Sequence, residues 1–178
     1  MKHIVEQILN ESLNASERFV RENAANLIRL AETIAAAFTG DRKLLICGNG
    51  GSAADAQHIA AELVNRYILE RPPLPAIALT TDTSVLTSIG NDYGFDQVFS
   101  KQIKALGVPG DVLMALSTSG NSENVLAAVR EARRIGIYTA GFTGGGGGKL
   151  KRAVDAAFVV DNPSTPRVQE AHALAGHI

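Results

Sequence analysis

Val112–Ser122 reads V-L-M-A-L-S-T-S-G-N-S, an apolar run that passes directly into a loop of hydroxyls, glycine and asparagine. The apolar part is typical of a buried strand, and a helical pattern begins near Glu123. Hydroxyls and backbone N–H groups then gather where the next helix presents the positive end of its dipole. Helix capping explains one or two such hydroxyls, but this loop has four of them and no Lys or Arg. The stretch therefore predicts a binding site for a phosphate monoester.

The composition is that of one globular domain. The chain has 178 residues, of which 46% are hydrophobic and 20% charged, enough for a full core. A formal net charge of -1 and the lack of a basic block argue against a nucleic-acid groove. The single cysteine, Cys47, fits a reducing compartment, and no signal peptide or membrane-spanning run is recognisable. We expect a cytoplasmic protein that binds neither nucleic acid nor membrane.

The chain divides into a helical N-terminal segment and an alternating α/β region. Residues 4–38 carry apolar side chains at three- and four-residue steps, typical of a helix, with a break expected at Asn14–Ser16. Further helices are expected from Ser52 to about Arg66 and at 84–89, 122–135 and 167–178. Strands are expected at 43–47, 75–79, 111–116, 137–142 and 156–160. This alternation predicts a five-stranded parallel sheet flanked by helices, with ligands at the carboxyl ends of the strands.

A second glycine-rich loop, Gly48–Ser52, follows the first expected strand. Read on to Ala53, it gives the G-x-G-x-x-A variant of the dinucleotide fingerprint. The acidic partner of that fingerprint would be Asp82, which comes later in the chain than usual. A nicotinamide-dependent oxidoreductase rests on this pattern alone and leaves the serine loop unexplained. Two polar loops at neighbouring strand ends suit a phosphosugar better, one for the phosphate and one for the hydroxyls.

Five consecutive glycines, Gly144–Gly148, follow the fourth expected strand. Glycine holds no fixed geometry cheaply, so we expect a flexible surface loop, with a mobile lid as the alternative.

Histidines and carboxylates recur in two helical stretches. The i, i+4 spacing of His58 and Glu62 puts both side chains on one helix face, where they suit a metal ion or an acid/base pair. By spacing alone, a solvated surface pair is the simpler interpretation. The last helix carries Gln169, His172 and His177, and a terminal histidine often only interacts with the helix dipole.

Four motifs together resemble one family. They are C-G-N-G-G-S-A-A-D-A-Q-H-I-A-A-E-L (Cys47–Leu63), I-G-N-D-Y-G-F (Ile89–Phe95), S-T-S-G-N-S (Ser117–Ser122) and R-V-Q-E-A-H-A-L-A-G-H (Arg167–His177). Their order and content resemble the phosphoheptose isomerases of the sugar isomerase (SIS) fold, and the resemblance covers nearly the whole chain. It implies a flavodoxin-like SIS domain over residues 41–178 and an oligomerisation segment over residues 1–40.

The resemblance also implies an activity and its residues. The activity is conversion of sedoheptulose 7-phosphate to D-glycero-D-manno-heptose 7-phosphate, the first step towards the heptoses of bacterial lipopolysaccharide. The implied substrate-binding residues are Asn49, Gly50, Gly51, Ser52, Glu62, Asn91, Asp92 and Gln169, with Ser117, Thr118, Ser119 and Ser122 on the phosphate.

The same resemblance implies a zinc ion in each subunit, a proton-transfer pair and a homotetramer with sites at subunit interfaces. The implied zinc ligands are His58, Glu62, Gln169 and His177, with Glu62 as base and His177 as acid. Gln169 and His177 are eight residues apart, about 12 Å along a helix, so a shared ion needs extended side chains or a second subunit. Pro166 replaces an acidic residue frequent in the family. The family's last helix continues past His177, which raises the expectation of a shortened chain.

A different class of protein also has this fold. Some SIS proteins regulate bacterial replication initiation without catalysis, and Glu70–Thr81 resembles them as much as the isomerases. Those regulators lack the acid/base pair, whereas Glu62 and His177 are both present here. The sequence therefore favours the isomerase.

Overall fold

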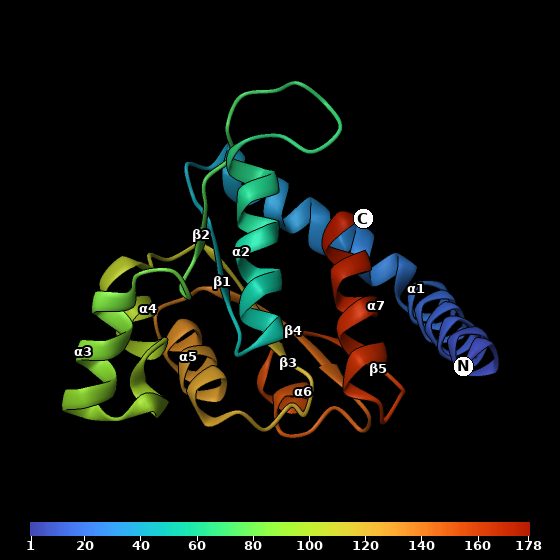
Figure 1. The fold of residues 1–178 in the computed structure, drawn as a ribbon. Helices are drawn as coiled ribbons and strands as arrows, with labels where there is room; N and C mark the ends of the chain where they lie inside the picture. The colour runs from blue at the N-terminus through green and yellow to red at the C-terminus, as the bar shows by residue number, and fades with distance from the viewer.

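The polypeptide forms one parallel sheet between two layers of helices (Figure 1). The computed structural model describes all 178 residues. The five strands, in the sheet order β2-β1-β3-β4-β5, are β1 (Leu44–Cys47), β2 (Ala76–Ala78), β3 (Val112–Ser117), β4 (Tyr138–Gly144) and β5 (Ala156–Val160). The helices are α1 (Lys2–Thr39), α2 (Gly51–Val64), α3 (Thr83–Tyr93), the 3-10 turn η1 (Phe95–Gln97), α4 (Ser100–Leu106), α5 (Glu123–Arg134), α6 (Leu150–Ala153) and α7 (Thr165–His177). The expected α/β architecture and all five expected strands are confirmed.

Alternate residues of each strand supply two separate hydrophobic cores. Ile46 and Met114 pack with α1, α2 and α7, whereas Leu45 and Leu113 pack with α4 and α5 on the opposite face. Because both faces of the sheet are covered, its central strands read as continuous apolar runs rather than alternating ones. No helix of the chain combines the length and apolar content that a membrane span needs.

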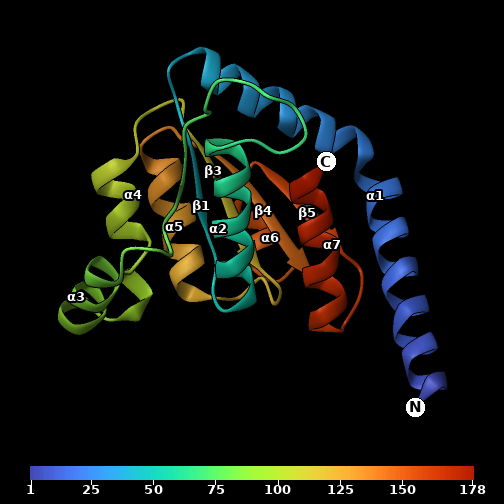
Figure 2. The ribbon, with the colours of Figure 1, turned by 45° about the horizontal axis from the view of Figure 1, so that its top comes forward.

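The first helix is continuous, so the break expected at Asn14–Ser16 is wrong. Lys2–Thr39 contains neither Gly nor Pro, and a few Asn and Ser residues cost a helix interior only about 0.7 kcal/mol each. The C-terminal part of α1 packs against the sheet and α7 through Phe19 and Leu27 (Figure 2). Its N-terminal part leaves a set of apolar side chains exposed: Ile4, Val5, Ile8, Leu9 and Leu13.

The sequence pattern did not predict two short helices or the capping role of Asp82. The helices α4 and α6 have seven and four residues, too few for a helical period to stand out. Asp82 is the N-cap of α3, where its carboxylate accepts a hydrogen bond from Val85 N at 2.9 Å. That cap extends α3 to Thr83–Tyr93, beyond the expected 84–89, and it gives Asp82 a structural role in place of the ribose contact of a dinucleotide site.

Phe19 tests whether α1 is part of the folded core. Its side chain is only 2% exposed, so Phe19→Ala should lower the free energy of unfolding by about 3–5 kcal/mol. Phe19→Leu keeps most of the volume and should cost less than about 1.5 kcal/mol. Chemical denaturation of the purified variants measures both. Equal and small losses in the two variants would show that α1 does not pack on the sheet.

Candidate active site

Two polar loops lie together at the carboxyl edge of the sheet. Strands β1 and β3 are parallel neighbours, with Cys47 opposite Ala115, so the chain segments that follow them leave the sheet at the same edge. Side chains tie these segments together, since the amides of Asn49 and Asn124 exchange two hydrogen bonds of 2.9 and 2.8 Å. Asn49 was predicted to bind sugar, whereas Asn124 stands inside a helix and has no motif to mark it.

The hydroxyls of the serine loop are not consumed by helix capping. Ser122 is the N-cap of α5, but its side chain makes no cap hydrogen bond and instead receives one from Ser117 Oγ at 3.0 Å. Ser119 Oγ accepts from Asn121 N at 3.2 Å, which folds the loop into a tight turn. The N-terminus of a twelve-residue helix therefore opens onto a ring of hydroxyls, as an anion site requires.

The glycine run Gly144–Gly148 is not the flexible surface loop that its composition suggests. Gly144 ends β4, where its N–H donates to Thr118 O at 2.9 Å, and Gly147 is buried. Gly120 has a positive φ of 65°, and a Cβ there would collide with Gly147 O. A Cβ at Gly148 would come within 2.5 Å of Ser119 O. The glycines therefore allow the backbone of the serine loop to lie directly against the backbone of the glycine run. This contact supports the serine loop.

Glycine is needed at the start of α2 as well. Gly50 has φ 55° and ψ -120°, a conformation that L side chains rarely adopt. At Gly48, a Cβ would come within 2.7 Å of Ser52 O, and at Gly51 it would meet the side-chain amide of Gln169. The start of α2 thus lies directly against the side chain of Gln169, near the start of α7.

Three of the candidate site residues meet two to three turns along α2. His58 Nε2 and His177 Nε2 are 2.7 Å apart, with His177 supplied by the last turn of α7. Glu62 Oε1 lies 3.9 Å from His58 Nδ1, and the Glu62 side chain is 28% exposed. Two imidazoles and a carboxylate thus share one partly open site, although His58 and His177 are 119 residues apart in the chain. The surface-pair interpretation of His58 and Glu62 is insufficient, because it does not account for His177.

The donor atoms fit zinc chemically but do not form a complete set within one chain. Zinc favours imidazole nitrogen and carboxylate oxygen, and the two Nε2 atoms converge on one point. No three His, Cys, Asp or Glu side chains are close enough to hold an ion together. Gln169 lies at the opposite end of the α2–α7 contact from His177, against Gly51. Gln169 and His177 therefore lie apart in the folded chain, as their spacing of eight residues along the helix predicts.

Two predicted sugar-binding residues lie away from this cluster. Asn91 and Asp92 are on α3, which is on the opposite side of α2 from α7 in both views (Figures 1 and 2). Asn91 Nδ2 donates to Asp92 Oδ1 at 2.8 Å, and both side chains are exposed. A single chain does not bring them to His58 and His177.

His172, a histidine of the last motif, is a core residue. It is fully buried, and its Nε2–H donates to Thr143 O at 3.2 Å. Burial lowers the pKa of His172 to about 4, so its ring stays neutral. Its place in the motif reflects packing of α7 on β4 rather than chemistry. Asp55, one turn before His58, has one buried oxygen without a partner, and burial raises the pKa of this carboxyl.

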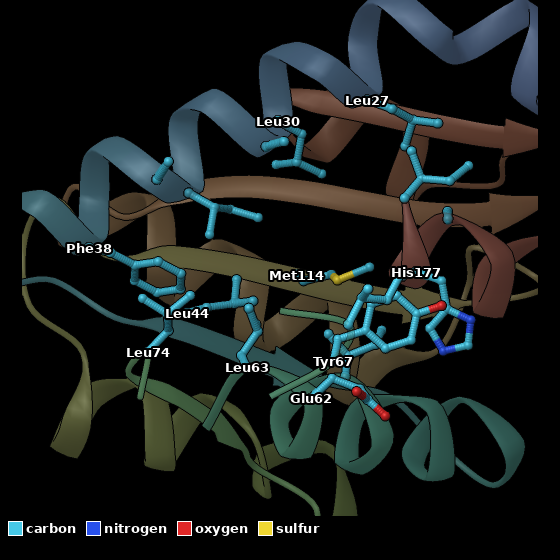
Figure 3. A pocket seen from close by; sticks show the side chains of 18 of the residues that line it. Leu27, Leu30, Phe38, Leu44, Glu62, Leu63, Tyr67, Leu74, Met114 and His177 are labelled. Atoms are coloured by element: carbon cyan, nitrogen blue, oxygen red, sulfur yellow. The ribbon is translucent and has the colours of Figure 1, made fainter. Parts of the chain in front are cut away.

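A large apolar groove opens beside the active cluster (Figure 3). Its volume is about 660 Å³, and α1, α2, α7 and the segment 67–74 line it. Leu27, Leu63 and Met114 contribute to its walls, while Glu62 and His177 lie at its edge. Most of the groove lining is apolar, which suits a phosphosugar less well than the polar loops at the strand edge do.

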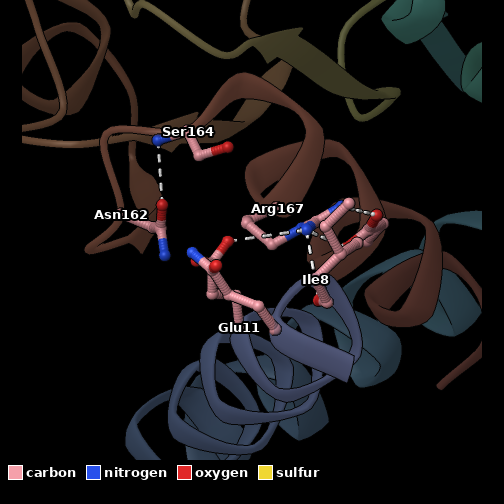
Figure 4. A network of polar contacts seen from close by, with 7 residues as sticks. Ile8, Glu11, Asn162, Ser164 and Arg167 are labelled. Atoms are coloured by element: carbon pink, nitrogen blue, oxygen red, sulfur yellow. Dashed lines mark hydrogen bonds and ion pairs between the residues drawn. The ribbon is translucent and has the colours of Figure 1, made fainter. Parts of the chain in front are cut away.

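The N-terminal turn of α7 is fixed to α1 by a buried arginine (Figure 4). Arg167 Nη1 donates to Ile8 O at 3.2 Å, and its Nε donates to Glu170 at 2.8 Å. Glu11 lies 3.9 Å from the same guanidinium. Because Gln169 lies between Arg167 and Glu170 in sequence, this link holds the turn that presents Gln169 to α2.

Known proteins match this chain along almost its full length. A family model described as the SIS domain matches residues 7–144. The phosphoheptose isomerase of Nitratidesulfovibrio vulgaris (strain DSM 19637 / Miyazaki F) is 52% identical over 177 residues, which cover 99% of this chain and 85% of that protein. The enzyme of the same name from Desulfovibrio desulfuricans is 58% identical over 162 residues, covering 91% of this chain and 77% of that one.

Solved structures show the same likeness. The phosphoheptose isomerase from Neisseria gonorrhoeae superposes with a TM-score of 0.93 at 45% identity, covering 99% of this chain and 94% of that one. The enzyme from Francisella tularensis gives 0.87 at 38% identity, covering 97% and 94%. The serine loop and the His–Glu–His cluster thus occur in a chain that belongs to the phosphoheptose isomerases, a family of sugar-phosphate isomerases built on the SIS domain.

Proposed function

We propose that this enzyme converts sedoheptulose 7-phosphate to D-glycero-D-manno-heptose 7-phosphate through an enediol, with Glu62 as base and His177 as acid. The observation that carries the proposal is the meeting of Glu62, His58 and His177 on the helix that follows the polar loop Gly48–Ser52, two to three turns from that loop. The names of the similar proteins support the choice of a phosphorylated heptose. A non-catalytic regulator would have no use for an acid and a base placed together in an open site.

The reaction moves a carbonyl from C2 to C1 of the sugar. Glu62 takes a proton from C1 and returns it to C2, so no external proton donor is needed at carbon. His177 donates a proton to O2 as the enediol forms and accepts the O1 proton as the aldehyde forms. His58, whose Nε2 faces Nε2 of His177, holds the imidazole of His177 in the orientation that proton transfer needs. Electrons stay within the substrate, and both catalytic groups end in their starting protonation states.

The two loops divide the binding of the substrate. Ser117, Thr118, Ser119 and Ser122 hold the phosphate with the N-terminus of α5. Asn49, Gly50, Gly51, Ser52 and Gln169 bind the hydroxyl chain at the start of α2, where Gly51 lies against the Gln169 side chain. The phosphate thus anchors one end of an extended sugar while C1 and C2 reach Glu62.

We further propose a zinc ion in each subunit, held by His58, Glu62, Gln169 and His177. When bound, the ion supplies Lewis-acid stabilisation of the negative charge that develops on the substrate oxygens. The convergence of two Nε2 atoms supports this set, although the position of Gln169 requires its side chain or its helix to move. Of its two roles, Glu62 serves first as the base, because ligation lowers the basicity of a carboxylate.

The active enzyme is, in this proposal, a cytoplasmic homotetramer with sites at subunit interfaces. Exposed apolar side chains on α1, including Ile4 and Leu13, need a partner surface, and an apolar groove is available to receive one. A second subunit would also bring Asn91 and Asp92 to a site that one chain leaves without them. Residues 1–40 then join subunits as well as covering the sheet.

Glu62→Gln tests the base. This change removes the charge but keeps the shape, so turnover should fall by about 10²–10⁴-fold while sedoheptulose 7-phosphate still binds. Aldose formation is followed by NMR and binding by calorimetry. Glu131→Gln, on α5 and paired with Arg134, is the matched control and should keep full activity. Normal turnover by Glu62→Gln would remove Glu62 from the chemistry.

Gly120→Ala tests the serine loop. Positive φ and the contact with Gly147 O make a side chain at Gly120 strained by about 1–3 kcal/mol, so the KM for the phosphosugar should rise about tenfold or more. Gly146→Ala is the matched control, because Gly146 has no close neighbour and no positive φ. Steady-state kinetics on both variants decide the point. A KM that is the same in the two variants would contradict the support of the phosphate site by the glycine run.

Removal of the metal tests whether the enzyme needs a bound zinc ion for activity. Protein freed of metal by a chelator should lose isomerase activity and regain it with Zn²⁺, and elemental analysis should find about one zinc per subunit. His177→Ala should reduce the bound zinc, whereas His3→Ala, which changes an exposed histidine on α1, should not. Full activity in protein shown to contain no metal would leave the acid/base pair as the whole catalyst.

A further inference from the structure

The imidazole of His177 is held between two rings. On one side, its Nε2 faces His58 Nε2, with the ring planes at 75°. On the other side, Tyr67 lies nearly parallel to it, with ring centroids 5.0 Å apart and an angle of 12° between the planes (Figure 3). Tyr67 belongs to the segment between α2 and β2, and neither the motifs nor the proposed mechanism give it a role.

Main-chain hydrogen bonds hold the backbone of α7 but do not select the rotamer of a side chain such as His177. A flat aromatic neighbour restricts rotation of the imidazole while leaving its nitrogens free, because stacking occupies the face of the ring and not its edge.

The segment that carries Tyr67 is itself clamped to α2. Arg71 Nη2 donates to Glu62 O at 3.0 Å, and Arg71 Nη1 donates to Leu63 O at 2.9 Å. Leu74 N also donates to Leu63 O at 3.0 Å. These bonds satisfy carbonyl groups that the end of a helix leaves open. The position of Tyr67 is thus tied to the residue that carries the proposed base.

We propose that Tyr67 is a positioning residue for His177, and that Arg71 holds Tyr67 in place. This inference rests on the proposed function of His177 as the acid. The stack keeps His177 Nε2 directed at the cluster formed with His58 and Glu62, so proton transfer starts from an ordered imidazole. The ring of Tyr67, not its hydroxyl, does this, because the contact with His177 is a stack of the two rings.

Kinetics separate the ring from the hydroxyl. Tyr67→Leu should lower kcat about tenfold and leave KM within about twofold, because orientation of the acid is lost while the substrate-binding loops are untouched. Tyr67→Phe keeps the stack and should retain wild-type kcat. Tyr67 is 46% exposed, so neither change threatens folding. An equal loss of kcat in both variants, or a loss confined to KM, would overturn the proposal.

A second measurement does not depend on activity. In the stack, the ring current of Tyr67 shifts the NMR signals of the His177 ring protons, which the His177→Gln variant identifies. Tyr67→Leu should abolish that shift and Tyr67→Phe should keep it. Unchanged His177 signals in Tyr67→Leu would overturn the proposal, even in an enzyme with normal turnover. An inactive wild type that shows the shift would instead contradict the proposed function and leave the stack established.

Arg71 is tested through its coupling to Tyr67. Arg71→Leu should lower kcat and weaken the same NMR shift, because Tyr67 loses its anchor. If both residues act through the stack, the double variant should be no slower than the slower single variant. Losses of kcat that multiply in the double variant would show that Arg71 acts independently of Tyr67, which would overturn the clamp.

Discussion

The pairing of β1 with β3 at the centre of the sheet is the constraint on which the site depends. From β1 the chain crosses to β2 on one side, whereas from β3 it crosses to β4 on the other. The two crossover segments diverge and leave a crevice at the carboxyl edge, the usual place for a ligand in such a sheet. The loops after Cys47 and Ser117 border this crevice because their strands are hydrogen-bonded neighbours. The position of the proposed phosphosugar site follows from the strand order.

Missing side chains shape the crevice as much as the polar groups do. At Gly48, Gly51 and Gly120 the backbone approaches another group more closely than a Cβ would allow, whereas Gly50 has a positive φ with open space around it. The candidate site is therefore lined by backbone and small hydroxyls, which suits an anionic ligand without a cationic side chain.

The candidate site has two parts: the loops at the strand ends, which are held rigidly, and His177, which is held by residues far from it in the sequence. The loops at the strand ends are held by hydrogen bonds within the sheet and by the Asn49–Asn124 amide pair. His177, by contrast, contacts His58 and Tyr67, which belong to other segments of the chain. Arg167 fixes the start of the same helix to α1. The helix thus holds Gln169 against the start of α2 and His177 against His58.

The sequence by itself determined the α/β class, the five strands, the positions of the two polar loops and the family, because these follow from short-range patterns and motif spacing. Local patterns also misled: Asn14–Ser16 does not break α1, and Gly144, Gly147 and Gly148 of the glycine run are packed rather than loose. Only the tertiary structure decided these points and placed Tyr67 on His177. The physical reason is separation along the chain. His58 and His177 are 119 residues apart in the sequence. The spacing of residues within one helix does not show which residues of another helix pack against it.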